Sequence, residues 1–369
     1  MGKAILRGGR IAVVTITVIA AVVGGVLYWS GVFTSAEVVE APALAPAGYT
    51  SEQLGLLAVA EEKAGTVDAL SALKKLAVQH IAAGQDGLAG DALAAIAGSC
   101  GELAQTPGAV HEIVKGAVKE GRGAEIGAVC EALAGQEREG GVWMGMGEVL
   151  AGVYGGDDAV VDAGTDRLVE RYGADERCVE AMGQIAYAFR QVKKFERAGQ
   201  YYQYVVDTWP HGKRAVFSVR GLVWMREALG DAAGAGAALD KLLVEYKDDA
   251  DFVECVRPLA DSFEQKKDYN TAIRIHQYVS DNRPGDGMAV WSQFKVFKIA
   301  LAELKDETLA RGAYNRVVER FGGHGRIAQV MCEAAWEYRK LNRHAEAMGP
   351  DNIVFCRTAL HYRYERPHY

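Results

Sequence analysis

Apolar residues recur at spacings of three and four along most of the chain, which is the pattern of amphipathic helices. Two stretches, residues 178–207 and 252–281, share their pattern, so that Phe189 aligns with Phe263. Similar segment endings recur at a nearly constant interval, starting at Leu168, Val205, Leu242, Val279 and Val317. This interval of about 37 residues is half the shift between the two stretches, and it predicts an array of stacked helical hairpins.

Residues 51–141 keep the helical spacing but are rich in alanine and glycine. Nearly half of the 43 glycines in the chain lie between Gly84 and Gly173. Each glycine in a helix interior costs about 1 kcal/mol relative to alanine, so packing against neighbours must hold this region together. We predict helical hairpins over residues 51–141, and the sequence leaves their repeat type open.

An uncharged apolar stretch runs from Ile11 to Phe33. At about 1.5 Å per residue it is roughly 34 Å long, enough to cross a hydrocarbon core of about 30 Å. Basic residues precede it, and Tyr28 and Trp29 lie near its far end, where interfacial aromatic residues are expected. We predict a cytoplasmic N-terminus over residues 1–10 and a retained transmembrane helix over 11–33; a cleaved signal peptide is the alternative.

Residues 34–50 contain two prolines among small residues, which favours a semi-extended spacer. The positive-inside rule then predicts a single-pass inner-membrane protein whose bulk lies in the periplasm or another extracytoplasmic space. The net charge is −7, and residues 1–33 contribute three basic residues and no acidic one, so the remainder carries −10. Because the body is acidic, we expect no nucleic-acid partner. We expect contact with the lipid bilayer through residues 11–33.

Residues 179–210 resemble a tetratricopeptide repeat, a family of helix–turn–helix units of about 34 residues known for superhelical arrays and peptide-binding grooves. In this resemblance Phe189 is the aromatic residue of the first helix, Ala198 the small residue of the second, and Pro210 the closing proline. Residues 253–284 match at further positions: Val256, Leu259, Ala260, Phe263, Tyr269, Ala272, Val279 and Pro284. A third match begins at Ala328 and departs from the pattern at Gly349 and Pro350.

The resemblance implies an all-α, right-handed superhelical solenoid, with TPR-like repeats over residues 142–350 and a C-terminal cap and tail over 351–369. Elementary packing agrees with it. Alanines 198 and 272 are small where two helices are expected to cross, and three aromatic residues are expected to fill the gaps between hairpins: Phe189, Phe263 and Tyr338. Prolines 210 and 284 would end one hairpin before the next begins, because proline cannot continue a helix.

Motifs for catalysis and cofactor binding are missing from the sequence. It contains no phosphate-binding GxxxxGK[ST] loop and no GxSxG nucleophile elbow. His111 and Glu112 begin like a zinc-protease motif, but the second histidine is missing. The six cysteines are far apart; Cys332 with Cys356 is the pair to test for a disulfide, whereas a buried free thiol is the expected role of most. We expect no enzymatic activity, no metal and no cofactor.

The resemblance also implies a partner-binding groove, lined by exposed residues on the first helix of each hairpin. Carried over to this sequence, those residues are Tyr187, Arg190, Gln191, Phe217, Arg220, Trp224, Arg257, Asp261 and Gln265. Tryptophan, tyrosine and arginine are the residue types enriched in binding hot spots. The alternative, that Phe217 and Trp224 pack between hairpins while the charged groups are merely solvated, stays open.

Together these features predict a membrane-anchored scaffold or accessory subunit that mediates protein–protein interaction in a membrane-associated complex. The first alternative is a periplasmic chaperone or assembly factor, which would bind many clients transiently. The second is an all-α cell-wall enzyme whose site is not visible in sequence motifs.

Overall fold

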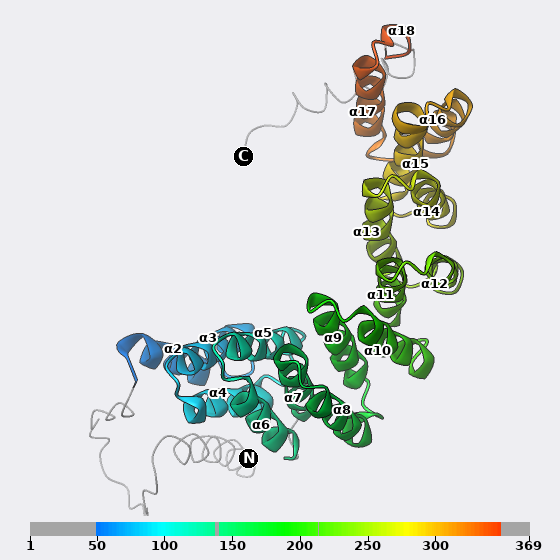
Figure 1. Ribbon diagram of the computed structural model, residues 1–369. Helices are drawn as coiled ribbons and strands as arrows, with labels where there is room; N and C mark the ends of the chain where they lie inside the picture. The colour runs from blue at the N-terminus through cyan, green and yellow to red at the C-terminus, as the bar shows by residue number, and fades with distance from the viewer. Residues whose placement is uncertain (1–48, 137–139, 213, 348–369) are drawn as a thin grey trace, which may run out of the picture. The chain divides into compact units, whose positions relative to one another are not determined.

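A computed structural model describes residues 49–136, 140–212 and 214–347. Within these ranges all regular structure is helical, from α2 to α18, and there is no strand (Figure 1). The chain forms two compact units, unit 1 up to Tyr201 and unit 2 from Tyr202. In each unit, helices pack against their neighbours in the chain and against the helix of the next hairpin. The predicted all-α helical solenoid is therefore confirmed.

Unit 1 begins with α2 (Ser51–Glu62) and continues as hairpins of a first and a second helix. The pairs are α3 (Val67–Ala82) with α4 (Asp86–Ser99), α5 (Thr106–Lys119) with α6 (Gly123–Ala134), and α7 (Gly141–Gly155) with α8 (Asp158–Tyr172). The next first helix is α9 (Arg177–Gln191), and α10 (Phe195–Thr208) after it crosses the boundary between the units. In Figure 1 the first helices α3, α5 and α9 lie along one edge of unit 1, and α4, α6 and α8 lie along the other.

Unit 2 continues with the same hairpin. Its pairs are α11 (Ala215–Ala228) with α12 (Ala232–Glu245), α13 (Phe252–Gln265) with α14 (Tyr269–Asn282), α15 (Ala289–Lys298) with α16 (Glu307–Phe321), and α17 (Ile327–Lys340) with α18 (His344–Ala347). A π-helical segment, η1 (Ile299–Leu304), extends α15. α10 and α14 end shortly before Pro210 and Pro284, as the prolines predict.

The predicted membrane segment, including Ile11, Tyr28 and Trp29, lies outside the described residues, and so does the predicted C-terminal cap over 351–369. None of the helices in the described ranges is both long and apolar enough to cross a membrane.

Each hairpin turns at a residue with left-handed backbone. These residues are Gly84, Gly121, Gly156, Lys193, Gly230, Lys267, Lys305 and Asn342. They recur at nearly equal intervals, so one turn geometry is repeated from α3 to α18. In four hairpins an aspartate follows, and its carboxylate accepts a backbone N–H from the first turn of the second helix: Asp157, Asp231, Asp268 and Asp306. The hairpins whose repeat type the sequence left open thus share the turn of the later ones.

The glycines of unit 1 allow close helix packing around α7, which is buried without interruption from Gly141 to Val153. A Cβ at Gly147 would lie 2.9 Å from the Cys130 sulfur, and one at Gly152 would lie 2.9 Å from Val161 Cγ2. Both separations are shorter than ordinary van der Waals contact, so only glycine fits there without displacing a neighbour. A composition that disfavours isolated helices is here the condition for packing α7 among its neighbours.

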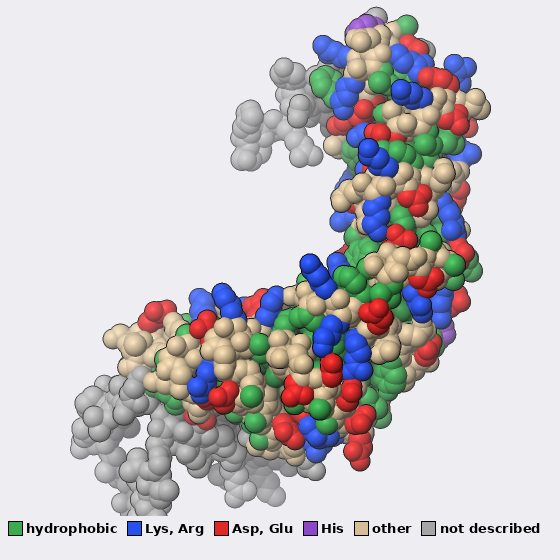
Figure 2. Space-filling view, in the orientation of Figure 1, with side chains coloured by type: hydrophobic (Ala, Val, Ile, Leu, Met, Phe, Trp, Pro, Cys, Tyr) green, Lys and Arg blue, Asp and Glu red, His purple; other side chains and the backbone are tan. Residues whose placement is uncertain are grey.

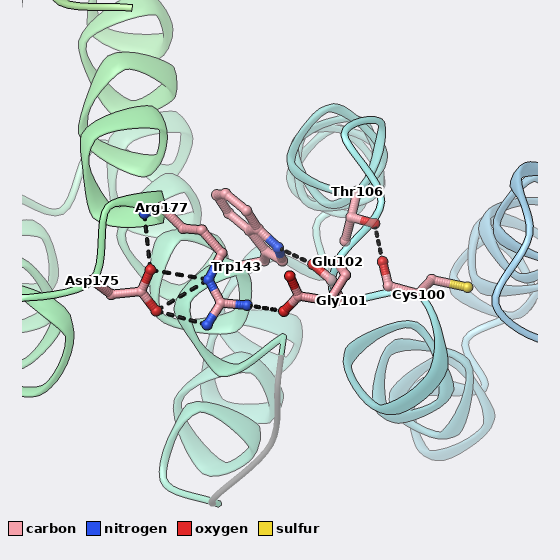
Figure 3. Close-up of polar contacts among 7 residues, drawn as sticks. All are labelled: Cys100, Gly101, Glu102, Thr106, Trp143, Asp175 and Arg177. Atoms are coloured by element: carbon pink, nitrogen blue, oxygen red, sulfur yellow. Dashed lines mark hydrogen bonds and ion pairs between the residues drawn. The ribbon is translucent and has the colours of Figure 1, made fainter. Parts of the chain in front are cut away.

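At the N-terminal ends of α5, α7 and α9, polar contacts hold the loops of unit 1 (Figure 3). The Trp143 indole N–H donates to the Gly101 carbonyl at 2.7 Å. The Arg177 guanidinium pairs with Asp175, with Nη2 2.6 Å from Oδ2, and reaches across to Glu102. These contacts satisfy a buried carbonyl and link the α4–α5 loop to the start of α9.

Exposed ion pairs join successive hairpins on their second helices and turns. In each of them the two partners lie about one repeat apart in the sequence: Lys194–Asp158, Arg197–Asp162, Arg274–Asp240, Arg320–Asp281 and Arg343–Glu307. Each exposed pair contributes at most about 1 kcal/mol. Their regular spacing shows that one register is kept along each unit.

The predicted core positions are confirmed. Ala198 and Ala272 are fully buried, and so is Phe189. Phe263 and Tyr338 are 6% and 9% exposed. In unit 2 one core cluster packs Phe297 against the Phe294, Tyr314 and Tyr338 rings at centroid distances of 5.3 to 5.9 Å.

Candidate functional site

The first helices of unit 1 bring six polar and aromatic side chains together, although they come from three successive hairpins. We refer to them as the α5–α7–α9 cluster: His111, Lys115, Tyr154, Gln184, Tyr187 and Gln191. α5 and α9 touch directly, even though the hairpin of α7 lies between them in the chain. α7 packs against both of them. Figure 2 shows several Lys and Arg side chains along the edge of unit 1 that contains α5 and α9.

His111 is the buried centre of the cluster. Its Nδ1 lies 3.1 Å from Gln184 Oε1, and its Nε2 lies 2.5 Å from the Tyr154 hydroxyl oxygen. A neutral ring that donates from Nδ1 and accepts the Tyr154 O–H at Nε2 satisfies both contacts. Burial lowers the pKa of His111, and the hydrogen bond to Gln184 opposes part of that shift. Both ring nitrogens are occupied, so His111 positions its neighbours instead of acting as a free base.

Tyr154 keeps its proton. Burial raises the pKa of the Tyr154 hydroxyl to about 12, so at neutral pH it remains the donor that His111 requires. The Lys115 ammonium lies 5.7 Å from the centroid of the Tyr154 ring, within the range of a cation–π contact, and it also donates to the Gln191 side chain. Lys115 thereby connects α5 to α7 and α9.

Tyr187 is the exposed member of the cluster. Its ring lies 6.0 Å from the His111 ring, and 44% of the residue is accessible to solvent. The Arg190 guanidinium carbon lies 5.9 Å from the centroid of the Tyr187 ring. The exposed Tyr187 ring therefore lies beside the Arg190 cation, and its inner side faces the buried His111 ring.

In unit 2, the predicted residues Phe217, Arg220 and Trp224 share one face of α11. The Arg220 guanidinium carbon lies 5.0 Å from the Phe217 ring centroid and 4.8 Å from the Trp224 ring centroid. All three side chains are partly buried. Burial raises the pKa of the Cys255 thiol on α13 to about 12, and the charge of Arg220 opposes that rise. Arg220 is thus stacked between two aromatic rings and lies toward α13.

The three predicted residues of α13 do not meet in one place. Arg257 and Gln265 are exposed, and Asp261 lies 3.9 Å from the Lys295 ammonium of α15. A larger network next to them had no signal in the sequence motifs. Glu264 accepts hydrogen bonds at 2.9 Å from both His276 and Lys295. Burial pushes the pKa of Glu264 up, but the hydrogen bonds and charges of His276 and Lys295 together outweigh it and hold the pKa below its usual value.

The nine residues predicted to line the groove are thus divided between the units. Tyr187, Arg190 and Gln191 belong to unit 1, and the six others belong to unit 2. Sequence reasoning missed four members of the cluster in unit 1: His111, Lys115, Tyr154 and Gln184. A signal for His111 exists in hindsight, because it stands at the same distance from the start of its helix as Arg220 and Arg257 do in theirs. The weak pattern of the glycine-rich half hid that register.

Four of the described cysteines are packing residues. Cys100, Cys130, Cys178 and Cys255 are buried thiols, and burial raises the pKa of Cys130 and Cys178 to about 12, which leaves them protonated and unreactive. The predicted partner of Cys332, Cys356, lies outside the described residues. Within the described ranges, no three His, Cys, Asp or Glu side chains are grouped to hold a metal ion.

Comparison with known proteins adds no family to this description. No family model matches the sequence, and no curated protein sequence matches it. The resemblance to tetratricopeptide repeats therefore depends on the repeated residues themselves. Function has to be argued from the surfaces of the two units.

Proposed function

We propose that this chain is a membrane-anchored scaffold or accessory subunit that binds protein partners through the first helices of its TPR-like hairpins. In this proposal residues 11–33 hold the chain in the inner membrane, with the N-terminus in the cytoplasm and a right-handed solenoid on the other side. The α5–α7–α9 cluster is the observation that supports it best. Tyr187 is exposed there, and a buried hydrogen-bonded histidine fixes the side chains beneath it.

The physical argument is preorganisation. Binding costs less free energy when the contact residues are already ordered, because fewer rotamers are lost on association. The hydrogen bonds of His111 join α5, α7 and α9 below the exposed ring, so the surface is fixed before a partner arrives. Tyrosine and arginine side by side offer apolar area and directional donors, the combination found in hot spots. Attachment to a membrane would add to affinity by raising the local concentration of membrane-bound partners.

Affinity purification of the tagged full-length chain from detergent-solubilised membranes tests the proposal. The decisive variant is Tyr187→Ala, and its matched control is Tyr204→Ala on the second helix α10, since Tyr204 is 37% exposed. We expect one stoichiometric partner, whose recovery falls about tenfold with Tyr187→Ala and is unchanged with Tyr204→Ala.

Other outcomes would replace the proposal. Many substoichiometric clients would favour the chaperone alternative, and turnover without a partner would favour an enzyme. Equal recovery of the partner by both tyrosine variants would remove the cluster from the binding surface. Recovery of the protein in soluble form, trimmed at its N-terminus, would contradict the membrane anchor.

A further inference from the structure

Exposed leucines recur at the hairpin turns of unit 2. In three hairpins the residue just before the left-handed turn residue is a leucine, and Leu229, Leu304 and Leu341 are 39%, 38% and 44% exposed. The hairpin of α13 and α14 has Lys266 there instead. In unit 1 the same position has no exposed large apolar residue; it is occupied by Ala83, Glu120, Gly155 and the half-buried Val192. Apolar exposure that recurs at one position of a repeat indicates a shared contact surface, whereas single exposed leucines need no explanation.

Two of these leucines lie at neighbouring turns. Leu304 follows α15 and Leu341 follows α17, and these two first helices pack against each other. Trp336 precedes Leu341 by five residues, about 8 Å along the helix axis. It is 51% exposed, and Arg339 and Lys340 lie 5.6 and 5.9 Å from its ring centroid. We refer to Leu304, Trp336 and Leu341 as the turn patch.

The turn after α15 has a leucine because of an additional residue. The left-handed residues Lys267 and Lys305 are 38 positions apart, whereas Lys305 and Asn342 are 37 apart. The π-helical segment η1, which ends at Leu304, contains the additional residue. Counted from the start of its helix, Glu303 stands where Leu341 does in α17, so the additional residue puts a leucine at the turn in place of a glutamate. Single π-helical turns occur frequently at functional sites.

Acidic side chains beside the turn patch are bound within unit 2. Five of them have partners: Glu303 with the Tyr269 hydroxyl, Asp306 with the Leu309 backbone N–H, Glu307 and Glu346 with Arg343, and Glu337 with Lys340. Glu333, one turn before Trp336, is exposed and lies further from the turn. A carboxylate that already has a partner opposes the loss of water around it less than a free one does. The apolar side chains can therefore leave water without stripping free charges.

We infer that the turn patch enters the surface of the lipid bilayer in which the chain is anchored. Leucine and tryptophan side chains at such a surface enter about 5–10 Å into the boundary between head groups and acyl chains. Tryptophan favours the level of the head groups, and lysine and arginine keep their charges in water. Leu341, about 8 Å beyond Trp336 along the helix axis, would lie at the deeper level. Lys305, Arg339 and Lys340 stand beside the apolar residues, as this arrangement requires.

The turns suit a bilayer better than a protein partner because they are helix ends, which project singly into a soft surface and need no groove to receive them. The inference deepens the proposed function and rests on it, since it requires the anchor in residues 11–33. A second contact with the membrane would fix how unit 2 is presented to membrane-bound partners.

Photochemical labelling by lipid tests the inference. The full-length chain is placed as a single copy in a nanodisc of phosphatidylcholine that contains a phosphatidylcholine with a diazirine near the top of its acyl chain. Mass spectrometry after illumination then maps the labelled peptides. We expect label in residues 11–33 and in the peptides that contain Leu304 and Leu341.

The decisive variant combines Leu304→Gln with Leu341→Gln. It should lower labelling of both turns about tenfold, because two apolar side chains no longer favour the lipid. Trp336→Gln should lower it as well. The matched control is Val244 on α12, which is 64% exposed and more exposed than any residue of the turn patch. We expect no label at Val244 and unchanged labelling of the turns in Val244→Gln.

No label at the turns, or equal label at Val244, would overturn the inference. So would unchanged labelling in the double variant. If the double variant loses helix content by circular dichroism, Trp336→Gln decides the question alone, since Trp336 is a half-exposed residue within a regular helix. Label in residues 11–33 without label at the turns would discard the turn patch and leave the proposed function standing. Absence of label in residues 11–33 would contradict the anchor itself.

Discussion

The two units consist of the same helical hairpin, but their helices pack together in different ways. In unit 1 the helices pack closely because α7 has glycines where its neighbours approach. At these positions a Cβ atom would contact the neighbouring helices. Unit 2 fills the space between its helices with large side chains, and Phe297 contacts three other aromatic rings in one core cluster. Even the turns differ, since glycine takes the left-handed position in the first three hairpins of unit 1 and lysine or asparagine takes it in the last three of unit 2.

This difference in packing shows how the surface of a repeat array can change while the repeat length stays the same. In unit 1, α5 and α9 meet across α7 and assemble a cluster from three hairpins. Where the first helices carry Phe217 and Trp224, the side chains of one helix form the surface by themselves. Each of these packing modes can be broken separately, because each unit has its own core.

The largest expected effect is in unit 2. Phe297→Ala removes a fully buried ring from the cluster on α15 and should lower the free energy of unfolding of unit 2 by about 3–5 kcal/mol. Hydrogen-exchange mass spectrometry would localise the loss to peptides of α15 to α17. An equal loss of protection in α5 and α7 would show that the two units do not unfold separately.

Gly147→Ala is the corresponding test of unit 1. The added Cβ would lie 2.9 Å from the Cys130 sulfur and 3.2 Å from Val110 Cγ1, so α7 must move. Overpacking of this kind destabilises by about 1–3 kcal/mol. Hydrogen exchange of peptides from α6 to α8 would report it, and unchanged protection there would contradict the glycine packing described for α7.

The same substitution elsewhere in unit 1 should have the opposite sign. Gly183 lies inside α9, and a Cβ there would meet nothing within 4 Å. Gly183→Ala should therefore stabilise unit 1 by about 0.5–1 kcal/mol through helix propensity alone. Comparing Gly147→Ala with Gly183→Ala separates the effect of close packing from that of helix propensity. If both substitutions change the free energy of unfolding of unit 1 in the same direction, propensity or packing alone governs both sites.

The smallest expected difference is in pH dependence. The folded pKa of His111 lies below the unfolded value of 6.5, so between the two the unfolded chain holds a proton that the folded unit does not. Unit 1 should therefore lose stability as the pH falls below about 6.5, and level off below the folded pKa. The folded pKa of Glu264 lies below 4.5, so its contribution to unit 2 should persist to that pH and disappear only as the pH falls further, through the folded pKa.

Unfolding of each unit measured between about pH 7.5 and 3.5 by hydrogen exchange, corrected for intrinsic rates, would check both windows. His111→Gln should abolish the loss near pH 6 in unit 1 and leave unit 2 unaffected. A parallel loss in the variant would show that another group titrates.

Much of the fold could be predicted because the repeat is local. Apolar spacing within a hairpin predicted the helices, and the positions of Ala198, Phe189 and Phe263 predicted burial that the structure confirms. The earlier hairpins were harder to classify, because glycine and alanine leave little contrast between buried and exposed positions. The stack of Phe217, Arg220 and Trp224 was within reach of sequence reasoning, since their spacing of three and four puts them on one helical face.

The α5–α7–α9 cluster could not be predicted from the sequence. Sequence by itself determined the period, the hairpins and the face of each helix, since those depend on residues three or four positions apart or on residues one repeat apart. Only the tertiary structure decided that His111 meets Gln184 and Tyr187, which lie two hairpins further along the chain. The physical reason is that α5 and α9 belong to hairpins separated by another hairpin, and how closely they approach depends on the packing of both helices against α7, which the pattern of neither helix records.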